Sequence, residues 1–457
     1  MTPGTLVTTG IALLTATLPA LTLSAQEVID LPGRDQRLDA DFEEVFRIGA
    51  LDGEDWEMLA TVMHVAFDEK GNLYVVDGSG GMSFGGGTRV LGLGSDGLRI
   101  LVFDQSGNFL REFGTSGEGP GEFNMPAGFA VLRDGTTIVS DNGHRAYQLF
   151  DADGRFLRMV RGSEGAGPGG VSSNLLPDPR GNAVFTGEFG RSILVMNPGG
   201  GGAAPPTSRP ITRLALDGDA VDTDTVVDAW LPRREPAELK LPAGIQIAVE
   251  GDARAANALS GLSQPSVYEP FLMAGVLPDG SLVHSDSSAY ELKITPPDAA
   301  DAARVIRRPI RPEPVTPRIE KAYLEAREAA RREGGGASGA FMMMRSVGTG
   351  GGNPSGGSDQ TFTLEMPEPT FYPELSVLRD LSTTWDGSIW VRRRGDEPES
   401  DGPIDVVTGD GRYVGTFLKD ATEMPDAFGP NGMAAFIEHD DFDVARVVVR
   451  RLPAAVR

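Results

Sequence analysis

Residues 65–77 read VAFDEKGNLYVVD, which is an apolar strand, a turn containing Asp and Gly, and a second apolar strand. The same pattern recurs at AVLRDGTTIVSD (130–141), NLLPDPRGNAVFTG (174–187), GVLPDGSLVHSD (275–286), STTWDGSIWVRR (382–393) and, more faintly, GPNGMAAFIEHD (429–440). A tight hairpin turn favours glycine, because glycine adopts positive φ without steric cost. Each copy has one at its turn, namely Gly71, Gly135, Gly181, Gly280, Gly387 and Gly432. Six copies of one unit indicate a repeat fold.

A second hairpin follows four of the copies, at 99–114, 147–160, 213–227 and 404–417. Two hairpins make a four-stranded antiparallel sheet of roughly 45 residues, the size of a propeller blade. The last copy is one strand short after residues 443–452, and FEEVFRIG at 42–49 can supply that strand. We therefore expect an all-β, six-bladed β-propeller over residues 42–453, closed by its N-terminal strand so that no sheet edge is left exposed.

Four stretches exceed the blade repeat and are expected to loop out of the ring: 78–97, 197–210, 231–265 and 311–362. The last contains a helical run, PRIEKAYLEAREAARRE (317–333), which we interpret as a cap over one propeller face. A Gly-rich tract with Phe341 and three methionines follows it. We interpret these methionines as filling a gap against the helix, with a ligand or partner contact as the alternative.

Residues 10–25 are small and apolar and end in Leu23-Ser24-Ala25, which is typical of a signal peptide cleaved after Ala25. We expect export to the periplasm or the medium, with an uncleaved anchor as the alternative because no Lys or Arg precedes the apolar stretch. Residues 26–41 would then form an N-terminal linker. No other apolar run reaches the ~20 residues that span a bilayer, so we expect a soluble mature chain without a membrane span. We also expect it to be a monomer.

Composition excludes several classes of function. The 65 acidic and 41 basic residues give a net charge of −24, which argues against nucleic acid or an anionic membrane surface as a partner. The absence of cysteine excludes disulfides, thiolate nucleophiles and cysteine-type zinc sites. The sequence also lacks a GxSxG elbow, an HExxH helix and a P-loop, so no motif indicates an enzyme.

A longer motif occupies residues 117–157. It consists of Gly117-Glu118-Gly119-Pro120-Gly121-Glu122-Phe123, then Pro126, Asp141 and His144-Arg145. This stretch resembles the NHL-repeat proteins and the related bacterial exported six-bladed propellers, although Asp141 to Arg145 is one residue shorter than the family's element. The resemblance implies the propeller fold and structural turn roles for the motif. It leaves function open, because such propellers range from protein or carbohydrate binding to lyase and hydrolase chemistry.

One position repeats in every copy at the end of the second strand. Its occupants in chain order are Asp77, Asp141, Gly187, Asp286, Arg393 and Glu438. A carboxylate repeated at one structural position usually caps a neighbouring turn through backbone N–H groups. Gly187 and Arg393 interrupt the series, and a functional site on a repeat fold is often built where the repeat is broken.

The four histidines suggest a metal hypothesis. Related propeller lyases place zinc in the central channel, which the resemblance would extend to His64, at the start of an innermost strand in the register of Gly128, and to His284. His439 follows the last acid, and packing or surface roles remain the preferred interpretation of all four. The aspartates at 217–228 lack EF-hand spacing and are interpreted as an outer hairpin, while one calcium ion in the channel stays open.

The sequence thus favours an exported propeller scaffold that binds a protein, peptide or glycan on one face, without evident catalysis. The alternative is a metal-dependent lyase or hydrolase that uses zinc or calcium in the channel through His64, His284 and Arg393. Convergence of these three side chains would favour the enzyme, and divergence the scaffold. Glu438 and His439 are further candidates for the channel or binding face, and a purely structural protein would have no pocket under the cap.

Overall fold

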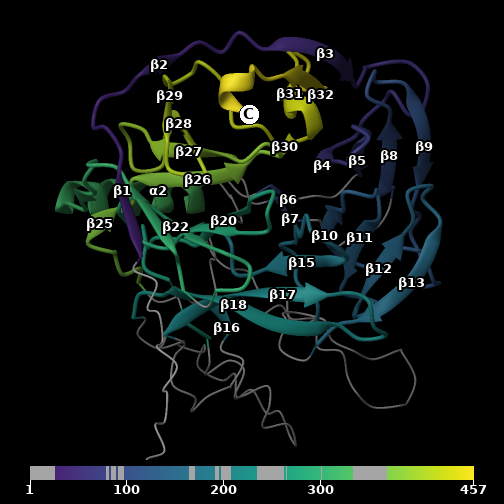
Figure 1. Cartoon of the computed structure of the whole chain (residues 1–457), viewed down its shortest axis with the longest axis horizontal. Helices are drawn as coiled ribbons and strands as arrows, with labels where there is room; N and C mark the ends of the chain where they lie inside the picture. The colour runs from purple at the N-terminus through teal and green to yellow at the C-terminus, as the bar shows by residue number, and fades with distance from the viewer. Residues whose placement is uncertain are drawn as a thin grey trace, which may run out of the picture.

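Six sheets surround a common axis in the computed structural model (Figure 1). The structure describes residues 26–78, 82–83, 89–90, 97–163, 170–190, 195–196, 207–233, 262–263, 265–299, 301–332 and 368–457. The sheets follow one another along the chain and are numbered here as blades one to six. The predicted all-β, six-bladed propeller is therefore confirmed.

Each blade contains four strands, which follow one another from the axis outward. Blade one contains β4 (Val62–Phe67), β5 (Leu73–Asp77), β8 (Arg99–Phe103) and β9 (Phe109–Phe113), and blade two contains β10 (Pro126–Val131), β11 (Thr137–Asp141), β12 (Ala146–Phe150) and β13 (Phe156–Arg161). Blade three contains β14 (Leu176–Pro177), β15 (Ala183–Thr186), β17 (Ser208–Ala215) and β18 (Asp222–Trp230). Blade four contains β20 (Met273–Val276), β21 (Leu282–Ser285), β22 (Glu291–Thr295) and β23 (Arg304–Arg307).

The last two blades complete the ring. Blade five contains β26 (Leu378–Thr383), β27 (Ser388–Arg394), β28 (Asp401–Thr408) and β29 (Tyr413–Phe417), and blade six contains β30 (Ala427–Phe428), β31 (Met433–His439), β32 (Ala445–Arg451) and β3 (Glu43–Ile48). Two short 3₁₀ turns, η2 (Pro430–Gly432) and η3 (Ala454–Val456), lie near the C-terminus. The four predicted second hairpins are all present, and blade four has one, β22–β23, that the sequence pattern did not reveal.

The predicted ring closure is confirmed, because β3 pairs antiparallel with β32. The preceding residues, which the sequence suggests are a linker, add two more strands. Here β1 (Glu27–Asp30) pairs parallel with β23, and β2 (Arg37–Leu38) pairs parallel with β29. Residues 26–48, called the strap below, therefore cover the outer edges of blades four and five before completing blade six (Figure 1).

Apolar contacts between neighbouring blades hold the ring together. The middle strands β5 and β11 are buried at every position, because another blade covers each face, whereas the outer strand β9 alternates between exposed and half-buried residues. The described residues contain one apolar cluster at each of the six blade interfaces. A ring packed in this way holds its innermost strands in fixed positions around the axis.

Five of the six predicted turn glycines have positive φ, between 73° and 98°. Gly181 does not, so the expectation fails there. Its turn is built differently, because the backbone N–H of Ala183 donates to the carbonyl of Gly181 itself, at 2.8 Å. The chain thus reverses without placing this glycine in the left-handed region.

The two faces of the ring carry different connecting segments. The hairpin turns that follow the innermost strands lie on one face, called the turn face, and the connections between blades leave from the other, called the loop face. The predicted insertions 78–97, 197–210, 231–265 and 311–362 all leave the loop face, although much of them lies outside the described residues and β17 already starts at Ser208. Short strand pairs lie within these insertions or directly beside them: β6 (Met82–Ser83) with β7 (Arg89–Val90), β16 (Val195–Met196) with β19 (Leu262–Ser263), and β24 (Glu313–Pro314) with β25 (Glu374–Leu375).

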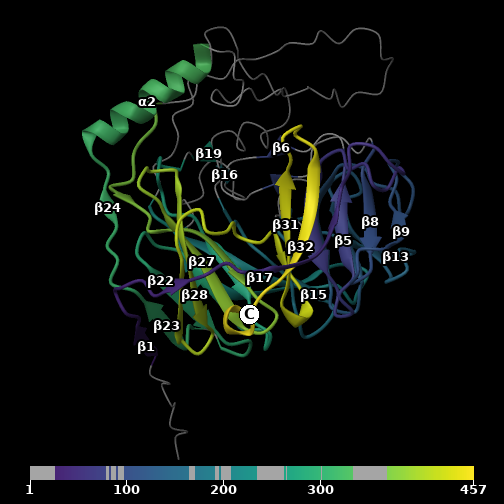
Figure 2. The same ribbon diagram turned by 90° about the horizontal axis from the view of Figure 1, so that it is seen from above.

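The predicted helix is present as α2 (Pro317–Arg332). Figure 2 shows it beyond the loop face, toward one edge of the ring, on the same side as β6, β16 and β19. It packs through Tyr323, whose ring lies 5.9 Å from that of Tyr268 and 5.6 Å from that of Phe371. The methionines at 342–344 and the signal-peptide stretch 1–25 lie outside the described residues. No helix within the described ranges is long and apolar enough to cross a membrane.

Candidate ligand-binding channel

A cavity of about 700 Å³ runs along the axis of the ring. Residues from the innermost strands of all six blades line it, including β4, β10, β14, β20, β26 and β30. Charged side chains line it toward the loop face, and the aromatic residues Phe129 and Trp385 lie farther in. This volume lies within the range of roughly 300–1,000 Å³ that is usual for ligand pockets.

Three innermost strands contain a β-bulge at the same place near the loop face. In β4, β10 and β26 one extra residue interrupts the pairing with the second strand. The residues that directly follow the bulge are His64, Gly128 and Asp380. A bulge changes the direction of the side chains beside it and is common next to binding sites. The predicted common register of His64 and Gly128 is present, and Asp380 of blade five occupies the same register.

Asp380 lines the channel and has an unusual environment. Its carboxylate accepts a hydrogen bond from the backbone N–H of Leu381 at 2.8 Å, and it has no ion pair with any described residue. Burial raises the pKa of Asp380, and the nearby charges of Asp401 and Asp426 raise it further, against the opposing effects of the Leu381 N–H and Arg392. Perturbed carboxylates in a cavity are candidates for functional residues.

Two arginines beside Asp380 are already paired. Arg392 donates to Asp401 at 2.6 Å and to Glu423 at 2.7 Å, while Arg379 donates to Asp401 at 2.9 Å. The arginine side chains are 9% and 18% exposed, whereas those of Asp401 and Glu423 are 53% and 73% exposed. With Asp380 and Asp426, the charged group at this end of the cavity comprises two arginines and four carboxylates. Its net charge is negative.

The opposite end of the cavity contains a contact across the axis. Arg133 follows β10 of blade two, and Trp385 follows β26 of blade five, so the two residues come from opposite sides of the ring. The guanidinium carbon of Arg133 lies 4.9 Å from the centre of the Trp385 ring. This cation–π contact narrows the channel at the turn face.

The three residues of the metal hypothesis do not come together. His64 lines the channel, whereas His284 and Arg393 are not among the residues around the cavity. His284 is buried within blade four, and burial lowers its pKa to about 4. The described residues contain no group of three or more His, Asp or Glu side chains placed to hold a metal ion. Binding of zinc or calcium stays a prediction.

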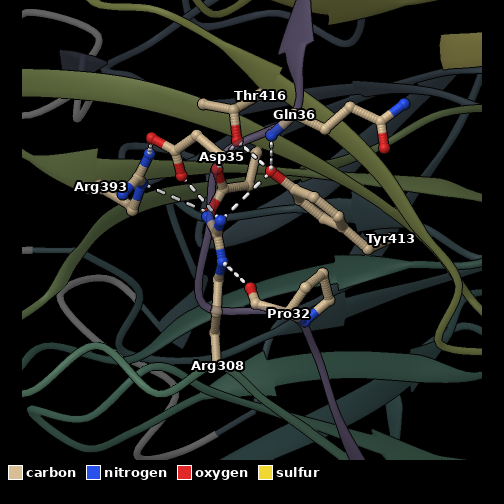
Figure 3. Close-up of polar contacts among 8 residues, drawn as sticks. Pro32, Asp35, Gln36, Arg308, Arg393, Tyr413 and Thr416 are labelled. Carbon is tan, nitrogen blue, oxygen red and sulfur yellow. Dashed lines mark hydrogen bonds and ion pairs between the residues drawn. The ribbon is translucent and has the colours of Figure 1, made fainter.

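Arg393 belongs instead to a buried polar network between blade four, blade five and the strap (Figure 3). It donates to Asp35 of the strap at 2.8 Å and lies 3.4 Å from Asp405. Arg308 donates to the same two carboxylates, each at 2.7 Å, and to the carbonyl of Pro32 at 2.9 Å. Burial acts to raise the pKa of Asp35, but the hydrogen bonds from Arg393 and Arg308 outweigh it and lower that pKa.

Three of the four repeated carboxylates, Asp77, Asp141 and Asp286, cap backbone N–H groups as expected, whereas Glu438 caps none among the described residues. Asp77 and Asp141 each accept backbone N–H groups from residues just before the innermost strand of their own blade, and Asp286 accepts one from the end of the preceding blade. Each also has a basic partner: the partners are Arg99 at 3.1 Å, His144 at 3.1 Å and Lys293 at 2.7 Å respectively.

The other predicted residues lie away from the cavity. Glu438 pairs with Arg450 at 2.6 Å within blade six, and His439 is exposed at the end of β31. Arg145 has positive φ in the turn that joins β11 to β12. Within the longer motif, the N–H of Gly119 donates to Glu122 at 2.8 Å and that of Gly121 to Gln148 at 3.0 Å, with Pro120 between the two glycines.

Sequence reasoning missed Asp380, Arg379 and Arg392, the charged residues at the loop-face end of the channel. Arg392 directly precedes the strand-closing position that attracted the prediction of Arg393. The signal that could have found Asp380 is its register. It follows the same bulge as His64, two residues into an innermost strand whose pattern is less apolar than that of β4.

Comparison with known proteins supports the fold. The family model DUF5128, described as 6-bladed beta-propeller, matches residues 95–161. NHL repeat-containing protein 3 is 29% identical in human and 33% identical in mouse over 86 residues, which is 19% of this chain and 21% of each relative. The match therefore spans about a fifth of those curated relatives.

Among solved structures, a putative exported protein from Bacteroides fragilis aligns over 93% of this chain and 100% of its own, with 10% identity and a TM-score of 0.45. The family-model match covers the two outer strands of blade one and all of blade two, with the longer motif between and within them. The chain is thus a six-bladed β-propeller that is similar over residues 95–161 to the 6-bladed beta-propeller family, and over 86 residues to NHL repeat-containing protein 3.

Proposed function

We propose that this protein is an exported, monomeric binding propeller that takes a ligand into its central channel from the loop face. The ligand would be a segment of a protein, a peptide or a glycan. One observation carries the proposal: a cavity of about 700 Å³ lies on the axis and is lined by every blade. A purely structural protein would not require such a pocket.

The packing of the ring supports binding in a preformed site. Each blade interface is filled by an apolar cluster, so the strands that line the cavity keep their positions whether or not a ligand is present. Preorganisation of this kind improves affinity, because less conformational freedom is lost on binding. The insertions leave the loop face, where they can contribute further contacts around the mouth of the channel.

The direction of entry follows from the two ends of the cavity. The turn-face end is crossed by the contact between Arg133 and Trp385, and the loop-face end is lined by charged side chains. Charged groups at the mouth of a cavity attract and orient a ligand as it approaches. A ligand would therefore enter from the loop face and place its apolar part against the rings deeper in the channel.

The alternative function, a metal-dependent lyase or hydrolase, has weaker support. Of its three proposed residues only His64 lines the cavity, and Arg393 is committed to the network with Asp35 and Asp405. Elemental mass spectrometry of the purified protein, dialysed without chelator, would test it directly. A content of about one zinc or calcium ion per chain would support the enzyme function, and His64 would then be the first residue to mutate.

Peptide and glycan arrays probed with the labelled protein would test the binding function. Ser382 lines the channel, so Ser382→Trp should block it and abolish binding to every hit, and the smaller Ser382→Leu should give a partial loss. The control is Ser106→Trp in an exposed outer turn of blade one, which should bind like the wild type. Undiminished binding by a folded Ser382→Trp protein would refute a channel site.

Export and monomeric state are part of the same proposal and have their own measurements. Amino-terminal sequencing of the protein recovered from the periplasm or medium should begin at Gln26, because the predicted cleavage follows Ala25. Light scattering should give the mass of one chain. A start at Met1 would indicate the uncleaved anchor instead.

A further inference from the structure

We infer that the ligand carries a cationic group, an ammonium or a guanidinium, and that this group pairs with Asp380 in the channel. This inference deepens the proposed binding function and rests on it. It assigns Asp380 as the residue that selects for charge.

The carboxylates of the buried aspartates are better satisfied than that of Asp380. Four of them have an arginine or lysine nitrogen within 3.1 Å, namely Asp77, Asp178, Asp286 and Asp405. The other two, Asp68 and Asp141, each accept three hydrogen bonds. Asp380 has one hydrogen bond, from the N–H of its neighbour Leu381, and no ion pair within the described part of the chain. A carboxylate that is partly buried without a basic partner is unfavourable, and a cation supplied by a ligand removes that penalty.

The surrounding charges point to the same class of ligand. Arg379 and Arg392 can bind an incoming anion only by breaking their hydrogen bonds of 2.6–2.9 Å to Asp401 and Glu423. The acids outnumber the arginines, and the net charge of −24 on the whole chain reinforces the local field. A cation is therefore attracted to this end of the channel and an anion is repelled.

The channel also shows how a cation fits within it. At the turn-face end Arg133 places its own guanidinium 4.9 Å from the centre of the Trp385 ring. The lining includes the aromatic side chains of Phe129 in β10 and of Phe271, which precedes β20 at the loop face. The aliphatic stem of an arginine or lysine side chain could lie along these rings while its charged end reaches Asp380.

Isothermal titration of the full chain with matched small probes tests the charge preference. N-acetyl-arginine amide should bind, and N-acetyl-citrulline amide, which has the same shape without the charge, should bind about tenfold or more weakly. N-acetyl-lysine amide and agmatine form two further arms. The lysine probe tests whether an ammonium binds as well as a guanidinium. Agmatine tests whether a free amine binds as well as the side chain of a peptide.

Two variants assign the preference to a residue. Asp380→Asn should remove the discrimination between the arginine and citrulline probes, whereas Asp386→Asn, an exposed aspartate of the same blade outside the cavity, should retain it. Wild-type affinity for the arginine probe should fall as the pH is lowered, by about tenfold per pH unit below the pKa of Asp380. A structural role for Asp380 would not produce this profile.

The outcomes separate this inference from the proposed function. Equal affinity for the arginine and citrulline probes, or unchanged discrimination in Asp380→Asn, overturns the inference. If the arrays yield only neutral or anionic ligands that Ser382→Trp blocks, binding in the channel stands and the cationic ligand is refuted. If the arrays yield nothing, both are refuted. Because burial and like charges disfavour the ionised carboxylate, Asp380→Asn should unfold at the same or a higher temperature than the wild type at neutral pH, so that loss of binding is not loss of folding.

Discussion

Replacing Arg308 with methionine should destabilise the protein by about 3 kcal/mol. The Arg308 side chain is fully buried and donates to Asp405, which is also fully buried, and to Asp35 of the strap. Removing one partner of a buried ion pair usually costs roughly 3–5 kcal/mol, because the other charge stays buried. The lower figure applies here, since Arg393 remains 3.4 Å from Asp405 and can still compensate part of its charge. Urea unfolding followed by circular dichroism gives the free energy directly.

Arg304→Met is the matched control for this experiment. Arg304 begins β23, the strand that Arg308 directly follows, and it also pairs with the strap, through Glu27 at 2.8 Å, but the two side chains are 30% and 56% exposed. An exposed pair contributes only about 0–1 kcal/mol. The double variant Arg308→Met/Asp405→Asn should recover at least about 1 kcal/mol relative to Arg308→Met, because it removes the stranded charge. Equal losses in the two single variants, or no recovery in the double variant, would refute the assignment of the network as the anchor of the strap.

Three further measurements test other parts of the structure. Trp385→Leu should lose about 1 kcal/mol more unfolding free energy than Trp385→Phe, because only the latter keeps an aromatic face for Arg133, and urea titrations yielding equal values would contradict the cross-channel contact. Burial lowers the pKa of His284 from 6.5 to about 4, so its neutral form contributes stability above pH 6.5 that is lost as the pH falls toward 4. As the pH falls over this range, the urea concentration at the unfolding midpoint should decrease less steeply for His284→Gln than for the wild type. Parallel curves would exclude His284 as the source of the pH dependence. Gly387→Ala should cost about 1–2 kcal/mol, because φ is 98° there and no atom lies within 3.4 Å of an added Cβ, whereas Gly181→Ala should be neutral or stabilising, as thermal unfolding of the two variants will show.

The fold was predictable because its information is local and repeated. The turn glycines and the apolar strands on either side of them mark every blade, and the strand at 42–49 was identifiable because the sixth copy was one strand short. The strap was not predictable beyond that strand. Parallel pairing of β1 and β2 over four and two residues depends on the outer edges of blades four and five, which are formed by residues hundreds of positions away.

The candidate site was harder to predict for a related reason. Arg393 stands out in the sequence because it replaces a repeated acid, yet its partner Asp35 lies 358 positions earlier in the chain. No local pattern connects the two. Asp380 does not stand out, because aspartate is common in this acidic sequence and the bulge that places it beside the channel is a tertiary feature. Burial and pairing, which distinguish these residues, become visible only in the folded ring.

Arg393 and Asp380 both depart from the repeat, and they differ in whether other described residues balance their charge. The charge of Arg393 is matched by Asp35 and Asp405, so this break in the series of acids is explained by the need to fasten the strap. The charge of Asp380 has no such match within the described residues, although it costs stability in the free protein. Selection for folding alone would favour replacing or pairing such a residue, as the other blades show with His64 and Gly128 in the same register. An unmatched charge inside a preformed cavity therefore indicates that its partner arrives from outside, which is the physical reason for placing recognition at Asp380 and anchoring at Arg393.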